Sequence, residues 1–270
     1  MDEWRLVINE PMDGAMNMAV DEAVLASVSR SLAPPTIRFY RWSPPAVSLG
    51  YFQSLQKELD LAACRKAGVD VVRRLTGGRA VLHQYELTYS IVAPEDNTKV
   101  AGSILEAYLA ISGGLVEGLA EMGITAELAA GTKPGAVASA VCFEAPSMYE
   151  LVVGGKKLVG SAQTRRSGCL LQHGSILIEL DPDLLFSIFN YDTEESRNQA
   201  KKLFLAKATC IKDILGYTPD PARLIACFTN GFSRGLEIKL REQQLAAAEL
   251  TLARELSSGK YQTEAWNGRK

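Results

Sequence analysis

Three arginines, two adjacent glycines and a histidine lie within eleven residues of the sequence, from Arg73 to His83. Because Gly77 and Gly78 have no Cβ atom, a ligand can approach the backbone there, and exposed N–H groups can hold an oxyanion or a carbonyl oxygen. The guanidinium groups would add positive potential around such a turn. A solvated hairpin turn with basic flanks explains the same pattern. A nucleotide-binding loop is not indicated, because the glycines match neither Gly-x-Gly-x-x-Gly nor a Walker loop.

Cys142 is the cysteine whose sequence context best suits a reactive thiol. It follows a run of small, turn-forming residues (129–140) that predicts a surface loop, and it precedes a predicted strand. The thiol could therefore lie at the rim of a cleft. A buried, inert thiol is the commonest fate of a single cysteine, and the residues alone leave that alternative open. The other cysteines lie within predicted helices or at the starts of elements: Cys64, Cys169, Cys210 and Cys227.

Two lysines precede the small residues Gly160, Ser161 and Ala162 on a predicted strand. Small neighbours leave room beside an ammonium group, which could bind a carboxylate or lower the pKa of a nearby thiol. Strand alternation puts Lys156 and Lys157 on opposite faces and does not decide which side chain points inward. An exposed hairpin lysine is the alternative, and the preferred one for Lys156.

The two histidines of the sequence both adjoin turn or strand residues. His173, beside Gly174, shares the polar face of a predicted strand with Ser175, so it could line a pocket, and surface exposure explains it equally well. His83, taken alone, is more often a structural histidine than a catalyst.

Strands are predicted mainly before residue 180, helices bracket and follow them, and the segment from about residue 182 is mostly helical. β-Branched and aromatic runs bounded by turn residues predict strands, and apolar residues at helical spacing predict helices. This order favours an α+β fold with a mixed, largely antiparallel sheet packed with helices, in one domain over residues 1–270. The predicted strands are Trp4–Ile8, Thr36–Trp42, Val47–Phe52, Val69–Arg73, Glu86–Val92, Ser147–Val153, Lys157–Gln163 and Leu170–Leu180. The predicted helices are Asn17–Ser29, Lys57–Ala67, Ser103–Met122, Asp183–Phe189, Glu194–Leu203, Pro221–Arg234 and Glu242–Leu256.

Glycines interrupt the clearest amphipathic helix, Ser103–Met122. Each of Gly113, Gly114 and Gly118 weakens a helix by about 1 kcal/mol relative to alanine. We therefore expect a neighbouring element to pack closely against them.

Composition excludes several classes of protein. The 270 residues carry a formal net charge of −2 and are 47% hydrophobic, which is typical of a soluble globular protein. A dedicated nucleic-acid binder would be strongly basic. The longest stretch without charged residues, Trp42 to Gln56, has 15 residues and two prolines, whereas a membrane span needs about 20 apolar residues. The N-terminus shows no secretory signal, so we expect a cytoplasmic protein without nucleic-acid or membrane partners.

Metal and disulfide sites are not expected either. The five cysteines are widely spaced and form no Cys-x-x-Cys motif. A disulfide framework is unusual in a cytosolic chain of this size, and two histidines are too few for a histidine-rich metal site.

Four motifs, in order along the chain, resemble those of the biotin/lipoate protein ligase superfamily, and within it the cysteine-dependent octanoyltransferases. The resemblance runs from about Trp4 to Asn267. The motifs are Arg-Arg-x-Thr-Gly-Gly-Arg-x-Val-Leu-His with Glu-Leu-Thr-Tyr-Ser (73–90), Cys-Phe-Glu-Ala-Pro-Ser-x-Tyr-Glu-Leu (142–151), Gly-x-Lys-x-x-Gly-Ser-Ala-Gln (155–163) and Leu-Gln-His-Gly-Ser-Ile-Leu (171–177).

The resemblance implies a reaction, a fold and a set of site residues. Such enzymes have the ligase-type catalytic domain and transfer an octanoyl group from octanoyl-acyl carrier protein to a lysine of a lipoyl domain, typically the glycine-cleavage H protein. No cofactor or ATP is implied, because thioester exchange is nearly isoenergetic. The nucleophile corresponds to Cys142, which would carry the acyl thioester, and the superfamily lysine to Lys157, whose ammonium would favour the thiolate. The implied substrate-binding residues are Arg73, Arg74, Thr76, Gly77, Gly78, Arg79, His83, Gly160, Ser161, Ala162, His173 and Gly174.

One motif departs from the ATP-dependent lipoate ligases of the superfamily. Those enzymes usually have Ser-Gly-Gly-Gly-Ala where this chain has Thr-Gly-Gly-Arg-Ala, and Arg79 would occupy the space that the third glycine leaves for an acyl-adenylate. They also tend to lack a cysteine at the position of Cys142. An ATP-dependent lipoate ligase, an octanoyl amidotransferase between lipoyl domains and a non-catalytic lipoyl-domain binder remain the alternatives. Since carrier proteins are usually acidic, we expect five arginines to steer docking: Arg73, Arg74, Arg79, Arg165 and Arg166.

Overall fold

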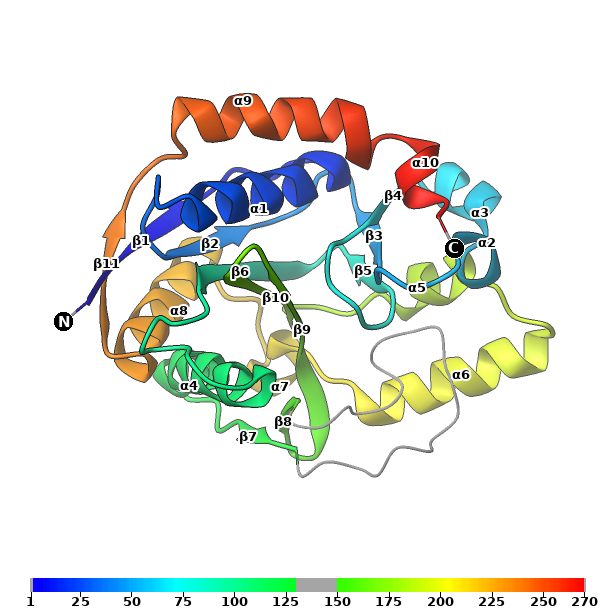
Figure 1. The fold of residues 1–270 in the computed structure, drawn as a ribbon. Helices are drawn as coiled ribbons and strands as arrows, with labels where there is room; N and C mark the ends of the chain where they lie inside the picture. The colour runs from blue at the N-terminus through cyan, green and yellow to red at the C-terminus, as the bar shows by residue number, and fades with distance from the viewer. Residues whose placement is uncertain (1, 130–149, 270) are drawn as a thin grey trace.

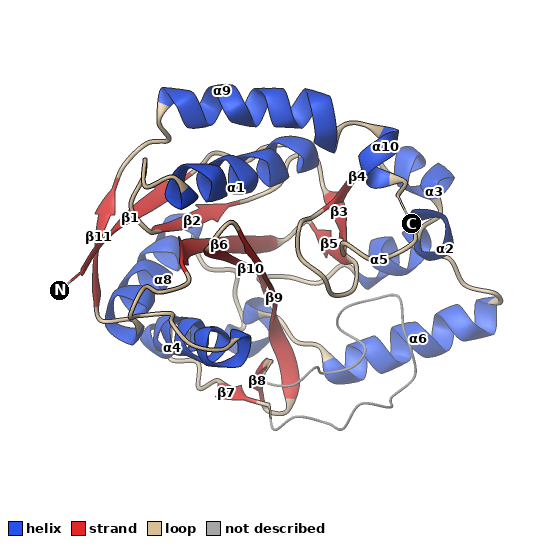
Figure 2. Ribbon diagram, viewed as in Figure 1, coloured by secondary structure: helices blue, strands red, loops and turns tan. Residues whose placement is uncertain are grey.

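The structure is a computed structural model that describes residues 2–129 and 150–269. Within those residues, an eight-stranded sheet runs in the order β11-β1-β2-β6-β10-β9-β8-β7 (Figures 1 and 2). β1 pairs in parallel with β11 and β2, and each of the other neighbouring pairs is antiparallel. The sheet is therefore mixed and largely antiparallel, as predicted. The strands are β1 (Asp2–Ile8), β2 (Thr36–Tyr40), β6 (Glu86–Pro94), β7 (Glu127–Leu128), β8 (Leu151–Val153), β9 (Lys156–Arg166), β10 (Cys169–Leu177) and β11 (Ile238–Glu242).

A second, three-stranded sheet has the order β4-β3-β5. β3 (Ala46–Leu49) pairs in parallel with β4 (Asp70–Arg73) and antiparallel with β5 (Val81–His83). The sequence predicted β2 and β3 as adjacent strands with a turn, and both form, but they belong to different sheets. β5 was not predicted. It follows the Gly77–Gly78 turn, so the turn connects β4 to β5 within the small sheet.

Helices cover both faces of the large sheet (Figure 1). On one face α4 (Ile104–Glu121) and α8 (Pro221–Gly235) pack against an apolar core, in which Phe39 and Tyr89 contact Phe232 of α8. On the opposite face lies α1 (Gly14–Ser29), with α9 (Ala247–Leu256) packed outside it. Because α1 has the sheet on one side and α9 on the other, it is apolar almost all round, as its sequence indicated.

The glycines of α4 allow α8 to approach closely. A Cβ atom on Gly114 would lie 2.3 Å from Cδ1 of Phe232, and one on Gly118 would lie 2.5 Å from Cδ1 of Phe228. The approach is mutual, since a Cβ atom on Gly231 of α8 would lie 2.3 Å from the backbone nitrogen of Gly118. This packing confirms the neighbour that the glycine pattern predicted.

The remaining helices surround the sheets. The predicted helix 57–67 is two helices, because Asp60 caps a new start by accepting hydrogen bonds from the backbone nitrogens of Ala62 and Ala63. The predicted helix 242–256 begins later, because the chain before it pairs with β1 as β11. The helices are α2 (Leu55–Glu58), α3 (Leu61–Lys66), α5 (Pro182–Ile188), α6 (Glu194–Lys207), α7 (Ile211–Leu215), the π-helical turn η1 (Ser257–Tyr261) and α10 (Glu264–Asn267). Among the described residues, no helix has the length and apolar character that a membrane crossing requires.

Candidate active site

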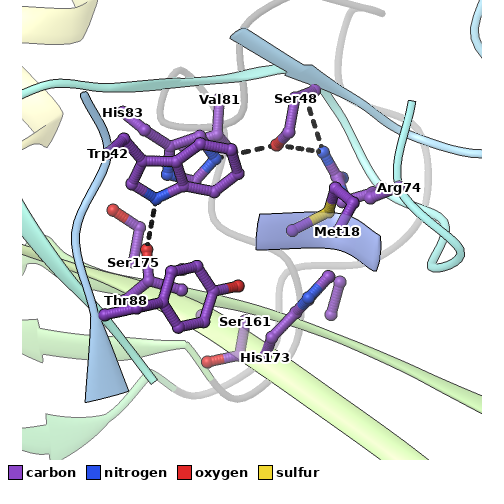
Figure 3. A pocket seen from close by; sticks show the side chains of 15 residues that line it. Met18, Trp42, Ser48, Arg74, Val81, His83, Thr88, Ser161, His173 and Ser175 are labelled. Atoms are coloured by element: carbon purple, nitrogen blue, oxygen red, sulfur yellow. Dashed lines mark hydrogen bonds between the residues drawn. The ribbon is translucent and has the colours of Figure 1, made fainter. Parts of the chain in front are cut away.

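A pocket lies between the two sheets, beside the Gly77–Gly78 turn (Figure 3). It holds about 430 Å³ of space, its open mouth included. Eight of the residues implied by the family resemblance line it: Arg74, Gly78, His83, Gly160, Ser161, Ala162, His173 and Gly174. The other lining residues are Met18, Tyr40, Trp42, Ser48, Val81, Thr88 and Ser175.

Strand register brings two of the four motifs together. On β10, His173 stands opposite Ala162 of β9, and Gly174 stands opposite Ser161. Gly174 has to be a glycine, because a Cβ atom there would lie 2.6 Å from Ser161 Oγ and 2.6 Å from Tyr89 Cε1. The small residues of β9 thus form part of the pocket wall, where the sequence predicted room beside a lysine.

His173 is buried between a hydroxyl and a carboxylate. Its Nε2 lies 2.7 Å from Thr76 Oγ1, and its Nδ1 lies 3.2 Å from Asp21 Oδ2 of α1. Asp21 also accepts hydrogen bonds from Arg38 Nη1 (2.8 Å) and Tyr40 OH (2.9 Å). Burial by itself would raise the pKa of Asp21, but the hydrogen bond from His173 and the Arg38 guanidinium lower it below its usual value, so Asp21 is ionised. Surface exposure, the alternative for His173, is wrong because α1 covers this face of the sheet.

His83, on the other wall of the pocket, is also buried between a hydroxyl and a carboxylate. Its Nε2 lies 2.8 Å from Ser48 Oγ, and its Nδ1 lies 3.3 Å from Glu86 Oε1. The ring stacks on the indole of Trp42 with 4.0 Å between centroids. Burial lowers the pKa of His83 below its usual value, although Glu86 opposes the shift, so the imidazole is neutral at neutral pH.

Arg74 connects the two histidine sites and the glycine turn. Its Nη1 donates to Ser48 Oγ (3.1 Å) and its Nε donates to Thr76 Oγ1 (3.0 Å). Its Nη2 donates to the carbonyl oxygens of Gly77 (2.7 Å) and Arg79 (2.8 Å). Gly78 has a φ of 91°, and a Cβ atom there would lie 2.9 Å from Arg74 Nη2, so this position requires glycine.

Arg73, the neighbouring arginine, lies outside this pocket. Its guanidinium donates to the carbonyl oxygens of Gly50 (2.9 Å), Gln53 (2.7 Å), Asn267 (2.7 Å) and Arg269 (2.9 Å). It therefore joins the C-terminal segment to the loop after β3. Arg73 and Arg74 are both buried, so the expectation that these two steer docking is wrong. Arg79, Arg165 and Arg166 are only partly buried. Thr76 and Gly77 stand behind the pocket wall, in contact with Arg74.

Lys157 is the lysine of the pair that points inward, and Lys156 is exposed. The Lys157 side chain is 2% exposed, and its Nζ donates to Glu150 Oε1 at 2.5 Å. Along β9 it precedes Gly160 of the pocket wall by three residues, which is about 10 Å of strand. Glu150 was not identified from the sequence, although a buried ammonium requires a partner of opposite charge.

Cys142 lies outside the described residues. The four cysteines that the structure describes are buried, and burial raises the pKa of each thiol: to about 11 for Cys64 and Cys210, and above its usual value for Cys169 and Cys227. At neutral pH these four are thiols inside apolar packing, which does not favour nucleophilic chemistry.

Sequence analysis gave no role in the site to Asp21, Arg38, Ser48, Trp42 and Glu86, although Glu86 lies within one of the motifs. Asp21 had a usable signal, since it is a charged residue in a helix that is otherwise apolar almost all round. Arg38, Ser48 and Glu86 lie on ordinary strand positions, and Trp42 forms an isolated bridge after β2. Their roles depend on which strands become neighbours.

The model for the lipoyl protein ligase A/B catalytic domain matches residues 13–233 of this chain. The chain belongs to that family. It is 45% identical to the octanoyltransferase LipM of Brevibacillus brevis over the whole of both chains. Among solved structures, the lipoate protein ligase of a bipartite archaeal lipoylation system from Thermoplasma acidophilum, studied with its E2 lipoyl domain, is 30% identical, with a TM-score of 0.82 over 100% of this chain and 99% of that one. A lipoate-protein ligase A bound with ATP is 28% identical, with a TM-score of 0.80 over 99% of each chain.

These similarities confirm the family resemblance that the four motifs carried, and the fold class with it. This lipoyl protein ligase A/B family member is an acyltransferase.

Proposed function

We propose that this acyltransferase moves an octanoyl group from acyl carrier protein to a lysine of a lipoyl domain, such as the glycine-cleavage H protein, through an acyl thioester on Cys142. The observation that carries the proposal is strand β9, which holds the buried Lys157 and, three residues further on, the Gly160–Ala162 wall of the pocket. Full-length identity of 45% to an octanoyltransferase supports the choice of acyl group.

The first step is a thioester exchange. The Cys142 thiolate attacks the acyl carbonyl carbon, a new C–S bond forms, and the bond to the carrier's thiol breaks, leaving that thiol to take up a proton. A free thiol has a pKa near 8.5, so only a few per cent is ionised at neutral pH. An ammonium group nearby would raise that fraction, and Lys157 is the buried cation of the family motif.

The second step forms the product. The neutral ε-amine of the acceptor lysine attacks the acyl-Cys142 carbonyl, the C–S bond breaks, and the amine proton goes to the departing sulfur. An amide is more stable than a thioester, so this step runs downhill without ATP. Backbone N–H groups at the glycine turn would stabilise the oxyanion that develops in both steps.

An ATP-dependent ligase is the alternative that the ligase neighbours raise. Those neighbours are 28–30% identical, whereas the octanoyltransferase relative is 45% identical over its whole length. In addition, Arg79 stands where ligases usually have the third glycine of the turn. Both observations favour acyl transfer.

Mass spectrometry of the intact protein tests the proposal. Octanoyl-acyl carrier protein without ATP should add one octanoyl group to the wild-type chain and to Cys64→Ala, the matched control for a buried cysteine. Cys142→Ala should gain none. The proposal fails if the wild type gains no adduct, or if Cys142→Ala still does.

Two further donors separate the alternatives. Modification of the lipoyl domain by octanoate only when ATP is present, surviving in Cys142→Ala, would indicate a ligase. Acyl-enzyme formation from an octanoylated lipoyl domain, and none from the carrier protein, would indicate an amidotransferase.

A further inference from the structure

A continuous chain of buried hydrogen bonds surrounds the pocket. An octanoyl chain is apolar and needs none of these groups for binding, so another role is required. Figure 3 shows its central part, where Ser48 joins Arg74 to His83. From one end to the other, the series of hydrogen bonds joins Asp21, His173, Thr76, Arg74, Ser48, His83, Glu86, Thr88 and Trp42.

Arg74 determines which groups donate and which accept in this series of hydrogen bonds. A guanidinium has five N–H donors and no acceptor, so Thr76 Oγ1 and Ser48 Oγ both accept from it. A hydroxyl has one proton and two acceptor lone pairs, so each hydroxyl can also donate to the Nε2 atom of its histidine, His173 or His83, where that nitrogen carries no proton. Each Nδ1–H in turn donates to a buried carboxylate. This direction of the hydrogen bonds makes each histidine an Nδ1–H tautomer, which is an assignment from the contacts of its ring nitrogens.

Arg74 also orients the glycine turn. It holds the carbonyl oxygens of Gly77 and Arg79 on its own side. In a trans peptide the C=O and the following N–H point in opposite directions, so the N–H of Gly78 is turned away from Arg74. Gly78 is a lining residue of the pocket.

We propose that Arg74 is the positioning residue of the glycine turn, and that the two histidine–carboxylate pairs fix Arg74 through Thr76 and Ser48. These residues act through the turn and do not touch the reacting atoms. The turn then presents the Gly78 N–H to the acyl carbonyl oxygen, a role that rests on the proposed function. Such a framework explains why both histidines of this chain lie at the pocket although neither is needed to bind an apolar chain.

Nitrogen-15 NMR of the histidine side chains tests the framework without any substrate. The chain has only two histidines, so the spectrum is simple. Both should show a protonated Nδ1 and an unprotonated Nε2 at neutral pH, and Arg74→Lys should shift the signals of both at once. An Nε2–H tautomer at either histidine, or signals unmoved by Arg74→Lys, would overturn the proposal.

Kinetics of acyl-enzyme formation test the role in the reaction. Thr76→Val keeps the shape of the side chain and removes the hydroxyl, so the first-order rate of acylation should fall by about tenfold or more, with KM for the carrier protein unchanged. Thr76→Ser restores the hydroxyl and should recover most of the rate.

Glu249→Gln is the stability control. It breaks a buried ion pair in which both Arg5 Nη atoms donate to Glu249 at 2.7 Å, between β1 and α9 and outside the pocket. It should lower the Tm without lowering the acylation rate of the folded enzyme. If Thr76→Val behaves like Glu249→Gln, the positioning role is wrong. If the wild type gains no octanoyl adduct, the proposed function fails. The NMR result alone then decides whether the two histidine–carboxylate pairs fix Arg74.

Discussion

The two faces of the large sheet are built on different principles. The face under α4 and α8 is apolar, and its helices approach until glycine and phenylalanine are in contact, as at Gly114 and Phe232. The face under α1 carries buried charged and polar side chains, among them Asp21, Arg38 and His173. On the first face stability comes from shape and burial. On the second, hydrogen bonds and ion pairs between groups that are often distant in sequence, such as Asp21 with Arg38 and His173, offset the cost of burying them.

This difference explains where the pocket lies. A closely packed apolar face leaves no room for a substrate. On the polar face, hydrogen bonds between buried groups hold the strands, the Gly77–Gly78 turn and helix α1 at fixed positions around the pocket. The following variants should separate the two kinds of face, beginning with the largest expected effect.

Lys157→Met removes the buried ammonium that pairs with Glu150 and that we propose activates Cys142. Breaking this buried ion pair costs about 3–5 kcal/mol of unfolding free energy. Loss of a group that assists the reacting thiol should also slow acyl transfer by about 100-fold or more. Urea denaturation and the intact-mass assay measure the two effects.

The double variant Glu150→Gln/Lys157→Met is the matched control. It removes both charges, so much of the stability should return while the activity stays lost. Recovery of activity together with stability would show that Lys157 has only a structural role.

Asp21→Asn should destabilise the polar face in a pH-dependent way. It leaves Arg38 without its charged partner, at a cost of about 3 kcal/mol near neutral pH. Because the pKa of Asp21 is lower in the folded protein than its usual value near 3.9, the carboxylate stabilises the fold above that value, and the contribution disappears as pH falls through the lower, folded pKa.

Urea denaturation of wild type and Asp21→Asn from pH 7 to pH 3 measures this dependence. The difference in unfolding free energy should be constant at neutral pH and narrow in acid. A difference that widens as the pH falls would contradict the assigned charge of Asp21.

Gly114→Ala should damage the apolar face without touching the chemistry. The new Cβ atom would lie 2.3 Å from Phe232 Cδ1, so the helices must separate, at a cost of about 2 kcal/mol. Gly113→Ala, where the nearest atom is 4.0 Å away, should instead gain up to about 1 kcal/mol. Thermal unfolding ranks the two variants, and both should keep the acylation rate of the folded enzyme. Equal stability for the two would contradict close α4–α8 packing.

Arg165→Glu should have the smallest effect, because this arginine belongs to neither buried face. Its side chain is 22% exposed and pairs with Glu95 at 3.3 Å. We expect a few-fold slower association with the acidic carrier protein, and less difference at high salt, since rim charges act mainly on association rates. Stopped-flow binding at two salt concentrations measures it, and an unchanged rate would remove Arg165 from the docking surface.

The apolar face was largely predictable from the sequence, because helical periodicity and the α4 glycines are local signals. The strands of the described residues were mostly predicted too, including β8 and β9, which pair as a hairpin. How the strands divide between two sheets was not predictable, since long-range pairing decides it. β5, β7 and β11 were missed for that reason.

The polar face was predictable only in part. The motifs contained His173 but not Asp21, which contacts it. Away from this face, they contained both Lys157 and Glu150 without showing that the two pair. Local sequence gives no rule for which carboxylate meets which cation. The position of Cys142 and the single-domain assignment remain predictions.

The contacts of Arg73 have a consequence for the order in which the protein folds during translation. The Arg73 guanidinium donates to the carbonyl oxygens of Asn267 and Arg269, and the backbone N–H of Arg73 donates to the Asn267 side chain. The last strand of the large sheet, β11, ends at Glu242, so the strands of both sheets are synthesised before the residues that complete the contacts of Arg73. A variant truncated before Asn267 would lose those acceptors, and Arg73 would keep the carbonyl groups of the loop after β3.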